Sequence, residues 1–222
     1  MRFLITAGPT REPIDPVRFL SNRSSGKMGY ALAEAALKLG HTVTLISGPV
    51  ALNAPDGADL HHVETAQQMW ETTRQVCASD TAPDIAIFAA AVADYRPKTI
   101  ASQKIKKHAD TLTLELERTP DVLGSMRGDF GFGGFLVGFA AETDEFVSHA
   151  MDKLKRKNCD IVIANDVSRA DTGFDSDENE VMLCLPGGQV EKVERMKKTE
   201  LARLLVGRIV TLAESRKLKT EH

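Results

Sequence analysis

The sequence predicts an α/β fold with a doubly wound, mostly parallel sheet and a C-terminal β-hairpin extension. Short apolar runs, typical of buried parallel strands, alternate with longer segments of helical periodicity. Strands that alternate with helices favour a parallel sheet covered on both faces. Near the C-terminus two strand-like runs flank Pro186, Gly187 and Gly188, and this pattern predicts an antiparallel hairpin.

Length, charge and cysteine content limit the class of protein. A chain of 222 residues suits one domain, expected over residues 1–215, with a frayed polar tail over residues 216–222. The net charge of −3 argues against binding to nucleic acid. No apolar run approaches the roughly 20 residues that span a bilayer, and Met1 leads directly into a strand rather than into an apolar leader. Three widely spaced cysteines form no disulfide pattern, so we expect a cytoplasmic protein without a membrane partner.

Turn and capping residues divide the chain into the expected elements. Gly40 ends the first helix, Thr65 and Thr143 cap later helices, and Pro120 opens a short one. In chain order we expect strand 2–7, helix 25–39, strands 42–47 and 59–64, a helix after 65, strands 84–93 and 111–117, a short helix after 119, strand 135–140, helix 143–157, strands 160–165, 181–185 and 189–193, and helix 199–213.

A cluster of glycines between residues 124 and 134 is similar in composition to a dinucleotide-binding fingerprint. The fingerprint follows a strand and opens a helix, whereas this cluster precedes the strand at 135–140. We therefore expect a Rossmann-like sheet without its dinucleotide site.

The connection over residues 8–29 is much longer than the roughly 2 to 6 residues usual between a strand and a helix. It carries prolines and basic residues, and it ends in small hydrogen-bonding residues before a helix, where unpaired N–H groups favour an anion. It is not a P-loop, because Ser21 stands where the motif needs Gly and Met28 where it needs Ser or Thr. The connection predicts a phosphate site; a capped helix behind a basic, solvated loop is the alternative.

Three further polar features have both a functional and a structural interpretation. Asp94 follows a buried strand at the sheet edge where ligands bind in such folds, but Asp is also common in caps and turns. The lysine run 104–107 is typical of solvated surface. Lys153 and Lys157 end a helix, where cations interact favourably with the helix dipole.

Motifs along nearly the whole chain resemble those of the phosphopantothenoylcysteine synthetase family. The opening segment GPTREPIDPVRFLSNRSSGKMG is followed, in the family's order, by AAAVADYRP (89–97), KIKK (104–107), TPDVL (119–123), GFAAET (138–143) and IANDV (163–167). The resemblance implies a ligase of coenzyme A biosynthesis. Such an enzyme joins 4′-phosphopantothenate to L-cysteine through an acyl-nucleotide intermediate and releases pyrophosphate and a nucleoside monophosphate.

The resemblance also implies the ligands and the partners. The KIKK pattern and the spacing of Lys153 and Lys157 are similar to those of the bacterial form that uses CTP, with ATP as the less favoured nucleotide. Mg²⁺ is expected to enter with the triphosphate, held mainly by phosphate oxygens and without a dedicated protein metal site. Family members dimerise, so the resemblance implies a homodimer.

Site residues follow from the same motifs, position by position. The resemblance implies that Asn22 acts on the acyl-nucleotide and that Lys104 belongs to a flap that closes over the reacting phosphates. It assigns nucleotide binding to Ala90, Asp94, Lys104, Thr119, Pro120, Asp121, Val122, Phe139, Lys153 and Lys157, and phosphopantothenate binding to Gly8, Ser24, Gly26, Gly29 and Asn165.

Two other function classes remain as alternatives. A non-catalytic nucleotide-binding regulatory module could use the same fold, although Asn22 and Lys104 argue against it. An oxidoreductase on a similar sheet is the second alternative, and it would bind NAD(P). The chain has no GxSxG elbow, no HExxH helix and no cysteine in a recognisable catalytic motif, so we expect catalysis by positioning and charge neutralisation.

Overall fold

The computed structural model describes residues 1–107, 110–142, 145–166 and 177–220. Its elements, in chain order, are β1 (Arg2–Ala7), β2 (Arg11–Pro13), β3 (Phe19–Ser21), α1 (Lys27–Lys38), β4 (Thr42–Ser47), β5 (Asp59–His62), α2 (Ala66–Cys77), β6 (Ile85–Phe88), β7 (Tyr95–Pro97), β8 (Leu116–Arg118), α3 (Val122–Ser125), β9 (Phe135–Glu142), α4 (Phe146–Arg156), β10 (Ile161–Asp166), β11 (Glu178–Cys184), a 3₁₀ turn (Pro186–Gly188), β12 (Val190–Lys197) and α5 (Lys198–Thr220).

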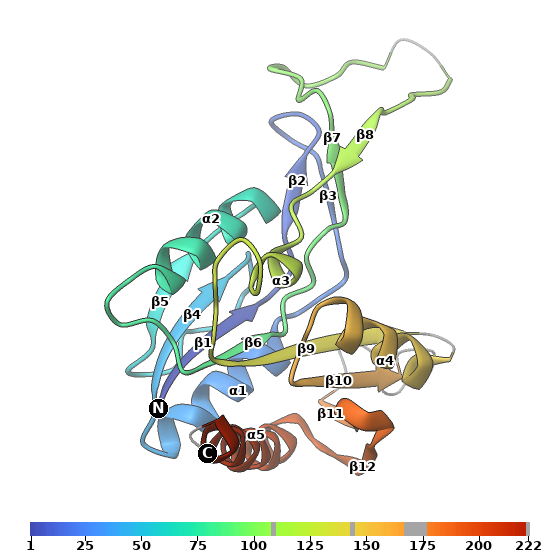
Figure 1. Ribbon diagram of the computed structural model, residues 1–222. Coiled ribbons are helices and arrows are strands. Elements are labelled where there is room, and N and C mark those ends of the chain that lie inside the picture. The colour runs from blue at the N-terminus through green and yellow to red at the C-terminus, as the bar shows by residue number, and fades with distance from the viewer. Residues whose placement is uncertain (108–109, 143–144, 167–176, 221–222) are drawn as a thin grey trace.

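A central eight-stranded sheet organises the molecule (Figure 1). Its strand order is β12-β11-β10-β9-β6-β1-β4-β5. The strands from β10 to β5 are parallel, whereas β11 pairs antiparallel with both β10 and β12. The predicted fold class, a doubly wound and mostly parallel sheet with a C-terminal hairpin, is confirmed.

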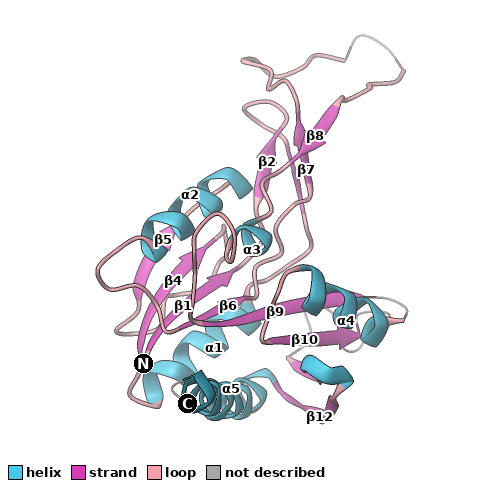
Figure 2. Cartoon of the chain, in the orientation of Figure 1, coloured by secondary structure: helices cyan, strands magenta, loops and turns pink. Residues whose placement is uncertain are grey.

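Helices cover both faces of this sheet (Figure 2). On one face α1 and α5 pack on an aliphatic core that includes Ile5, Leu32 and Leu205. On the other face α2, α3 and α4 enclose a second core around Leu4, Met69 and Leu136. Alternate residues of β1 thus point to opposite cores, as the period of two in a strand requires. Within the described residues, no helix is both long and apolar enough to cross a membrane.

An arm projects from the body of the molecule (Figure 1). We define the arm as the two antiparallel hairpins β2–β3 and β7–β8 with the described residues between their strands, that is, residues 11–21 and 95–118 without 108–109. Its base is fixed by Glu12, a buried residue whose Oε1 accepts a hydrogen bond of 2.8 Å from the N–H of Ala66 at the start of α2. The long connection after β1 therefore forms the β2–β3 hairpin, one of the two hairpins of the arm.

The predicted strand at 111–117 is wrong for most of its length. Leucine alternates with polar residues there, which is the period of a half-buried strand, but only β8 (Leu116–Arg118) is paired, with β7. Leu112 is 56% exposed and Leu116 is 43% exposed. Local alternation without a partner strand or a core did not form a strand.

The first and last helices also differ from their predicted bounds. α1 begins at Lys27 rather than at residue 25, because Gly26 adopts a left-handed conformation with φ of 77°. α5 continues to Thr220, so the predicted frayed tail is helical over residues 216–220. The Thr143 cap lies outside the described residues, and the helix it was expected to open begins at Phe146.

Arg216 explains why α5 continues past the predicted end. Its guanidinium donates to Oδ2 of Asp160 at 2.7 Å and to the carbonyl oxygen of Gly134 at 3.0 Å. The same Asp160 oxygen accepts from Arg127 and from the N–H of Leu136, both at 2.7 Å. Asp160 therefore ties α5, the loop before β9 and the start of β10 together.

Replacing Asp160 by asparagine should lower the free energy of unfolding by about 2 kcal/mol, because hydrogen bonds to a charged, mostly buried group contribute more than neutral ones. Urea unfolding measures this difference. The matched control is Asp129→Asn, which changes an exposed aspartate in the same region. Equal stability of the two variants would show that the Asp160 network contributes nothing.

Candidate active site

A pocket of about 1170 Å³ lies at the carboxyl ends of β6 and β9. This is the sheet edge at which ligands bind in open α/β folds. Every residue assigned to nucleotide binding lines it except Lys104, and those that do are Ala90, Asp94, Thr119, Pro120, Asp121, Val122, Phe139, Lys153 and Lys157. Three segments distant in sequence therefore meet here: the loop after β6, the turn before α3, and α4.

Hydrogen bonds join the first two of these segments. The Thr119 hydroxyl donates to the carbonyl oxygen of Ala93 at 2.6 Å, and the N–H of Thr119 donates to the carbonyl oxygen of Asp94 at 3.0 Å. Asp121 caps α3, with Oδ1 accepting from the N–H of Gly124 at 2.8 Å. The Thr-Pro-Asp turn is thus fixed against the loop that carries Ala90 and Asp94, and the Asp94 side chain remains exposed at the pocket.

Lys153 of α4 and Lys157, the C-cap residue of that helix, lie one helical turn apart on the same face, and both line the pocket. The Lys153 ammonium donates to the carbonyl oxygen of Phe139 at 2.6 Å. Lys157 forms an ion pair with Asp121, the cap of α3. These contacts hold both ammonium groups at the wall of the pocket, where they can neutralise phosphate charge.

Asn22 lies directly after β3 and is bonded to the wall of this pocket. Its Nδ2 donates to the carbonyl oxygens of Ala91 at 3.1 Å and Val92 at 3.0 Å. Ala90 and Val92 line the pocket. Because both N–H groups of the amide are directed at these carbonyls, Asn22 links the long connection after β1 to the nucleotide-site loop.

The residues assigned to phosphopantothenate lie mainly where β1 meets α1. Gly8 and Gly26 both have positive φ and face each other so closely that a Cβ on Gly26 would lie 3.3 Å from Cα of Gly8. The hydroxyl oxygen of Ser24 accepts a long hydrogen bond of 3.4 Å from the N–H of Gly26. Gly26, the N-cap residue of α1, has no side chain with which to cap the helix, and such a helix start favours an anion.

Gly29 and Asn165 are the remaining two residues assigned to phosphopantothenate binding. Gly29 is buried, and a Cβ there would lie 2.5 Å from Cβ of Ala7, so this glycine allows α1 to pack closely on β1. Asn165 lies near the end of β10, and its buried Oδ1 has no hydrogen-bond partner among the residues that the structure describes. An unpaired buried acceptor is costly, so Oδ1 of Asn165 is suited to accept a hydrogen bond from a ligand.

Among the residues assigned to nucleotide binding, Lys104 is the one that does not line this pocket. It is exposed and lies on the arm, between β7 and β8. In the described structure the arm segment that carries Lys104 is therefore outside the lining of this pocket. Reaching the pocket requires a change in the arm or a contribution from a second chain.

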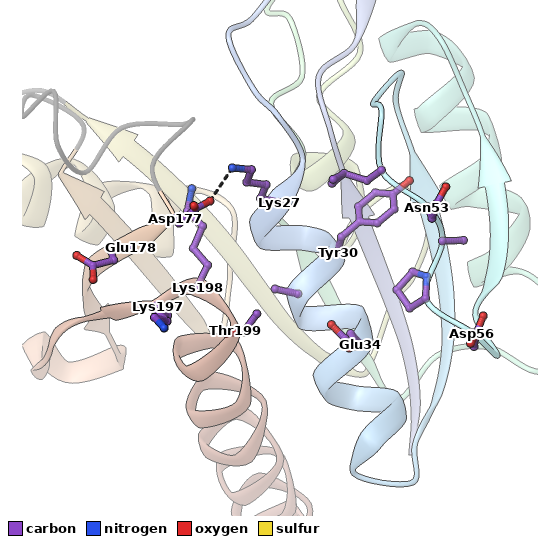
Figure 3. Close-up of a pocket in the computed structure, with 14 residues that line it drawn as sticks. Lys27, Tyr30, Glu34, Asn53, Asp56, Asp177, Glu178, Lys197, Lys198 and Thr199 are labelled. Carbon is purple, nitrogen blue, oxygen red and sulfur yellow. Dashed lines mark hydrogen bonds and ion pairs between the residues drawn. The ribbon is translucent and has the colours of Figure 1, made fainter.

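A second pocket, of about 960 Å³, lies between α1 and the start of α5 (Figure 3). Its lining includes Lys27, which forms an ion pair of 2.6 Å with Asp177, together with Tyr30 and Lys198. None of the residues assigned to a ligand lines it. The candidate active site is therefore the pocket at the ends of β6 and β9.

The cysteines do not provide a nucleophile. Burial raises the pKa of Cys77 and of Cys159 to about 11, and it also raises the pKa of Cys184. Thiols with raised pKa values remain protonated near neutral pH and are weak nucleophiles.

Further polar residues line the pocket without having been assigned to it, and four of them are basic: Arg118, His149, Lys155 and Arg156. The others are Thr6, Tyr95 and the carboxylate Asp152. His149 and Arg156 lie four residues before and three after Lys153, so helical spacing from Lys153 identifies them. Arg118 is opposite Tyr95 in the β7–β8 hairpin. No local pattern singles it out, because the hairpin itself was not predicted.

Comparison with known proteins tests the family. A family model for the DNA/pantothenate metabolism flavoprotein C-terminal domain matches residues 1–212. The coenzyme A biosynthesis bifunctional protein CoaBC of Vibrio parahaemolyticus is 49% identical over 189 residues, which cover 84% of this chain and 47% of the relative. The CoaBC protein of Bacillus subtilis is 46% identical over 212 residues, covering 95% of this chain and 51% of the relative. The chain spans about half the length of these relatives.

Solved structures agree with the sequence relatives. The crystal structure of the C-terminal domain of a CoaBC protein has a TM-score of 0.80 and 42% sequence identity, covering 96% of both chains. A Cab2 mutant in complex with phosphopantothenate-cysteine has a TM-score of 0.81 at 16% identity, covering 100% of this chain and 89% of Cab2, and so shares the fold. The family predicted from the motifs is confirmed: the chain belongs to the DNA/pantothenate metabolism flavoprotein C-terminal domain family.

Proposed function

We propose that this chain is a phosphopantothenate-cysteine ligase, which joins 4′-phosphopantothenate to L-cysteine with the hydrolysis energy of CTP. One observation carries the proposal: a single pocket gathers all the residues assigned to the nucleotide except Lys104, and Asn22 is hydrogen-bonded to the loop that lines it. The CoaBC relatives are named as coenzyme A biosynthesis proteins, and the Cab2 complex contains phosphopantothenate-cysteine.

In the first step a carboxylate oxygen of phosphopantothenate attacks the α-phosphorus of CTP. A P–O bond forms to give the acyl-cytidylate, and the bond to pyrophosphate breaks. The carboxylate is a poor electrophile, and this step gives it a phosphate leaving group. Lys153, Lys157 and Arg118 provide positive charge along the pocket against the charge of the triphosphate.

In the second step the amine of cysteine attacks the acyl carbon, the amide bond forms, and CMP leaves with the electrons of the broken C–O bond. The ammonium proton of cysteine is lost to solvent or to a phosphate. We assign Asn22 to this step. Because both N–H groups of its amide bond the carbonyl oxygens of Ala91 and Val92, Asn22 acts by holding the loop that lines the pocket beside the acyl-cytidylate. No covalent enzyme intermediate is needed, in agreement with the protonated cysteines.

The nucleotide and its metal are part of the same proposal. CTP rather than ATP follows from the KIKK segment and the spacing of Lys153 and Lys157, both similar to those of the bacterial form. Mg²⁺ enters with the triphosphate and is held mainly by phosphate oxygens. We place the reaction in the cytoplasm because the cysteines are unpaired.

The assay that tests the function follows pyrophosphate release with CTP or ATP, with and without phosphopantothenate. We expect release that depends on phosphopantothenate, is faster with CTP, and yields 4′-phosphopantothenoylcysteine when cysteine is added. Binding of CTP without release of pyrophosphate would instead support the regulatory module, and binding of NAD(P) would support the oxidoreductase.

We also propose that two chains form a homodimer through the arm. Large apolar side chains on the arm are exposed, including Phe19 at 45%, Ile100 at 56% and Leu112 at 56%. Exposed large apolar side chains gathered on one structural element are a feature of protein interaction sites. A second copy of the chain would cover these side chains and would also bring a second Lys104 into the assembly.

The double variant Ile100→Ser, Leu112→Ser should shift the protein from dimer toward monomer, because the dimer would bury less apolar area. Light scattering coupled to size exclusion measures the mass. The control Leu204→Ser, Leu218→Ser removes exposed leucines from α5 and should leave the dimer intact. A monomeric wild type, or a dimer that the arm variant does not weaken, would exclude this interface.

A further inference from the structure

The lysine segment of the arm is attached to the β2–β3 turn at Ile105. The N–H of Ile105 donates to Oδ2 of Asp15 at 3.1 Å, and the carbonyl oxygen of Ile105 accepts from Nη2 of Arg18 at 3.1 Å. Both backbone groups of one residue are therefore bound by a pair of side chains that lie about 90 positions earlier in the chain. Ile105 is the residue between Lys104 and Lys106.

Asp15 and Arg18 are themselves firmly joined. Nε of Arg18 donates to Oδ2 of Asp15 at 3.0 Å and Nη2 donates to the same oxygen at 2.5 Å. Oδ1 of Asp15 accepts from the N–H groups of Val17 and Arg18, both at 2.9 Å. The Asp15 side chain is fully buried in this arrangement. The Arg18 guanidinium holds the pKa of Asp15 well below its ordinary value of 3.8, so the carboxylate remains charged at neutral pH.

We propose that Asp15 and Arg18 are positioning residues that hold Ile105 and thereby place the Lys104 ammonium for the reaction. This inference rests on the proposed function and the proposed homodimer, in which the Lys104 that acts on the reacting phosphates comes from the arm of the second chain. A lysine side chain has several rotatable bonds, so its placement depends on how well its backbone is fixed. A neighbouring residue anchored at both its N–H and its carbonyl oxygen provides that fixation on an exposed segment.

The Asp15 side chain both stabilises the β2–β3 turn and holds Ile105, and the variant Asp15→Asn separates these two roles. Its remaining carbonyl oxygen can still accept from Val17 and Arg18, which keeps the β2–β3 turn. Its NH₂ group then faces the Ile105 N–H and the Arg18 guanidinium, all of which are donors, so the hydrogen bond to the Ile105 N–H is lost. Arg18→Lys is a second variant, since lysine keeps the charge beside Asp15 but lacks the forked guanidinium that also reaches the Ile105 carbonyl.

Hydrogen exchange at the Ile105 amide tests the attachment without an enzyme activity measurement. In Asp15→Asn the Ile105 amide should exchange at least about tenfold faster than in the wild type, because it loses its acceptor. The matched control Glu117→Gln breaks the 2.8 Å ion pair with Arg96 on the same arm and should leave the Ile105 amide unchanged. Unchanged exchange in Asp15→Asn and Arg18→Lys would overturn the proposal.

A double-mutant cycle with Lys104→Gln tests whether Asp15 acts through that lysine. Asp15→Asn alone should lower kcat about tenfold or more, with KM for CTP nearly unchanged, because misplacement of a catalytic group slows the reacting step. In the Lys104→Gln background, Asp15→Asn should cost less than about twofold. If the fold-loss in kcat of the double variant equals the product of the two single losses, Asp15 supports the arm independently of Lys104. That result would overturn the positioning role.

The two readouts separate this inference from the proposed function. If the wild type releases no pyrophosphate, the proposed function fails, while the exchange of the Ile105 amide still reports whether Asp15 holds the segment. If the wild type is active and Lys104→Gln is impaired, the cycle alone decides whether Asp15 acts through Lys104.

Discussion

Replacement of Asn22 by aspartate is expected to lower kcat by about a hundredfold to a thousandfold, the scale seen when a fixed hydrogen-bonding group of an active site is lost. The amide of Asn22 donates to the carbonyl oxygens of Ala91 and Val92. A carboxylate in its place presents an acceptor to two acceptors and adds negative charge beside the triphosphate. The acyl-cytidylate should therefore be stabilised poorly, and its conversion should stall.

Product formation and CTP affinity, measured separately, check this expectation. KM for CTP should change much less than kcat, because Asn22 bonds the loop beside the pocket and is not one of the residues that line it. Asn53→Asp, a change of an exposed asparagine in the second pocket, is the matched control and should keep wild-type turnover. Wild-type kcat in Asn22→Asp would remove Asn22 from the mechanism.

Replacement of Lys104 by glutamine should lower kcat by about a hundredfold, the scale expected when one charge that stabilises a transition state is lost. Because Lys104 does not line the pocket, it contributes little to the initial binding of CTP. KM for CTP should therefore change by less than about threefold, the pattern of an interaction made only in the transition state.

Lys98→Gln is the control for Lys104. Lys98 lies on the same arm, and its ammonium bonds Glu115 at 2.7 Å, so the change removes one positive charge without touching the segment around Ile105. We expect near wild-type kcat for this variant. If Lys104→Gln also retains wild-type kcat, or if its KM rises while kcat is unchanged, Lys104 is a surface residue or a simple binding residue.

The central sheet was predictable because each of its strands can be recognised from its own local sequence. β1, β4 and β10 are apolar runs closed by turn residues, and their observed bounds agree with the predicted ones to within one residue. The hairpin β11–β12 was marked by Pro186 and the two glycines that follow it. Such strands are buried whichever neighbours they have, so local pattern suffices.

The arm could not be predicted in the same way. Each of the four arm strands is only three residues long. They are strands because β2 pairs with β3 and β7 pairs with β8. The apparent strand over residues 111–117 had the correct alternation but no core, as the 56% exposure of Leu112 shows. Whether a short polar segment forms a strand depends on tertiary partners, which sequence pattern does not contain.

The candidate site was predicted mainly through family motifs, and its assembly came from the fold. The motifs at 89–97, 119–123 and in α4 converge because they follow parallel strands or pack against them at one edge of the sheet. His149 and Arg156 could have been found by helical spacing from Lys153. The attachment of Ile105 to Asp15 could not, because no local pattern relates residues 90 positions apart.

The most direct test of the proposed chemistry is a rapid-quench experiment with enzyme, CTP and phosphopantothenate in the absence of cysteine. We predict a burst of pyrophosphate equal to the concentration of active sites, an acyl-cytidylate that accumulates with it, and CMP that forms rapidly only after cysteine is added. Pyrophosphate release without phosphopantothenate, or rapid CMP formation without cysteine, would contradict the two-step reaction.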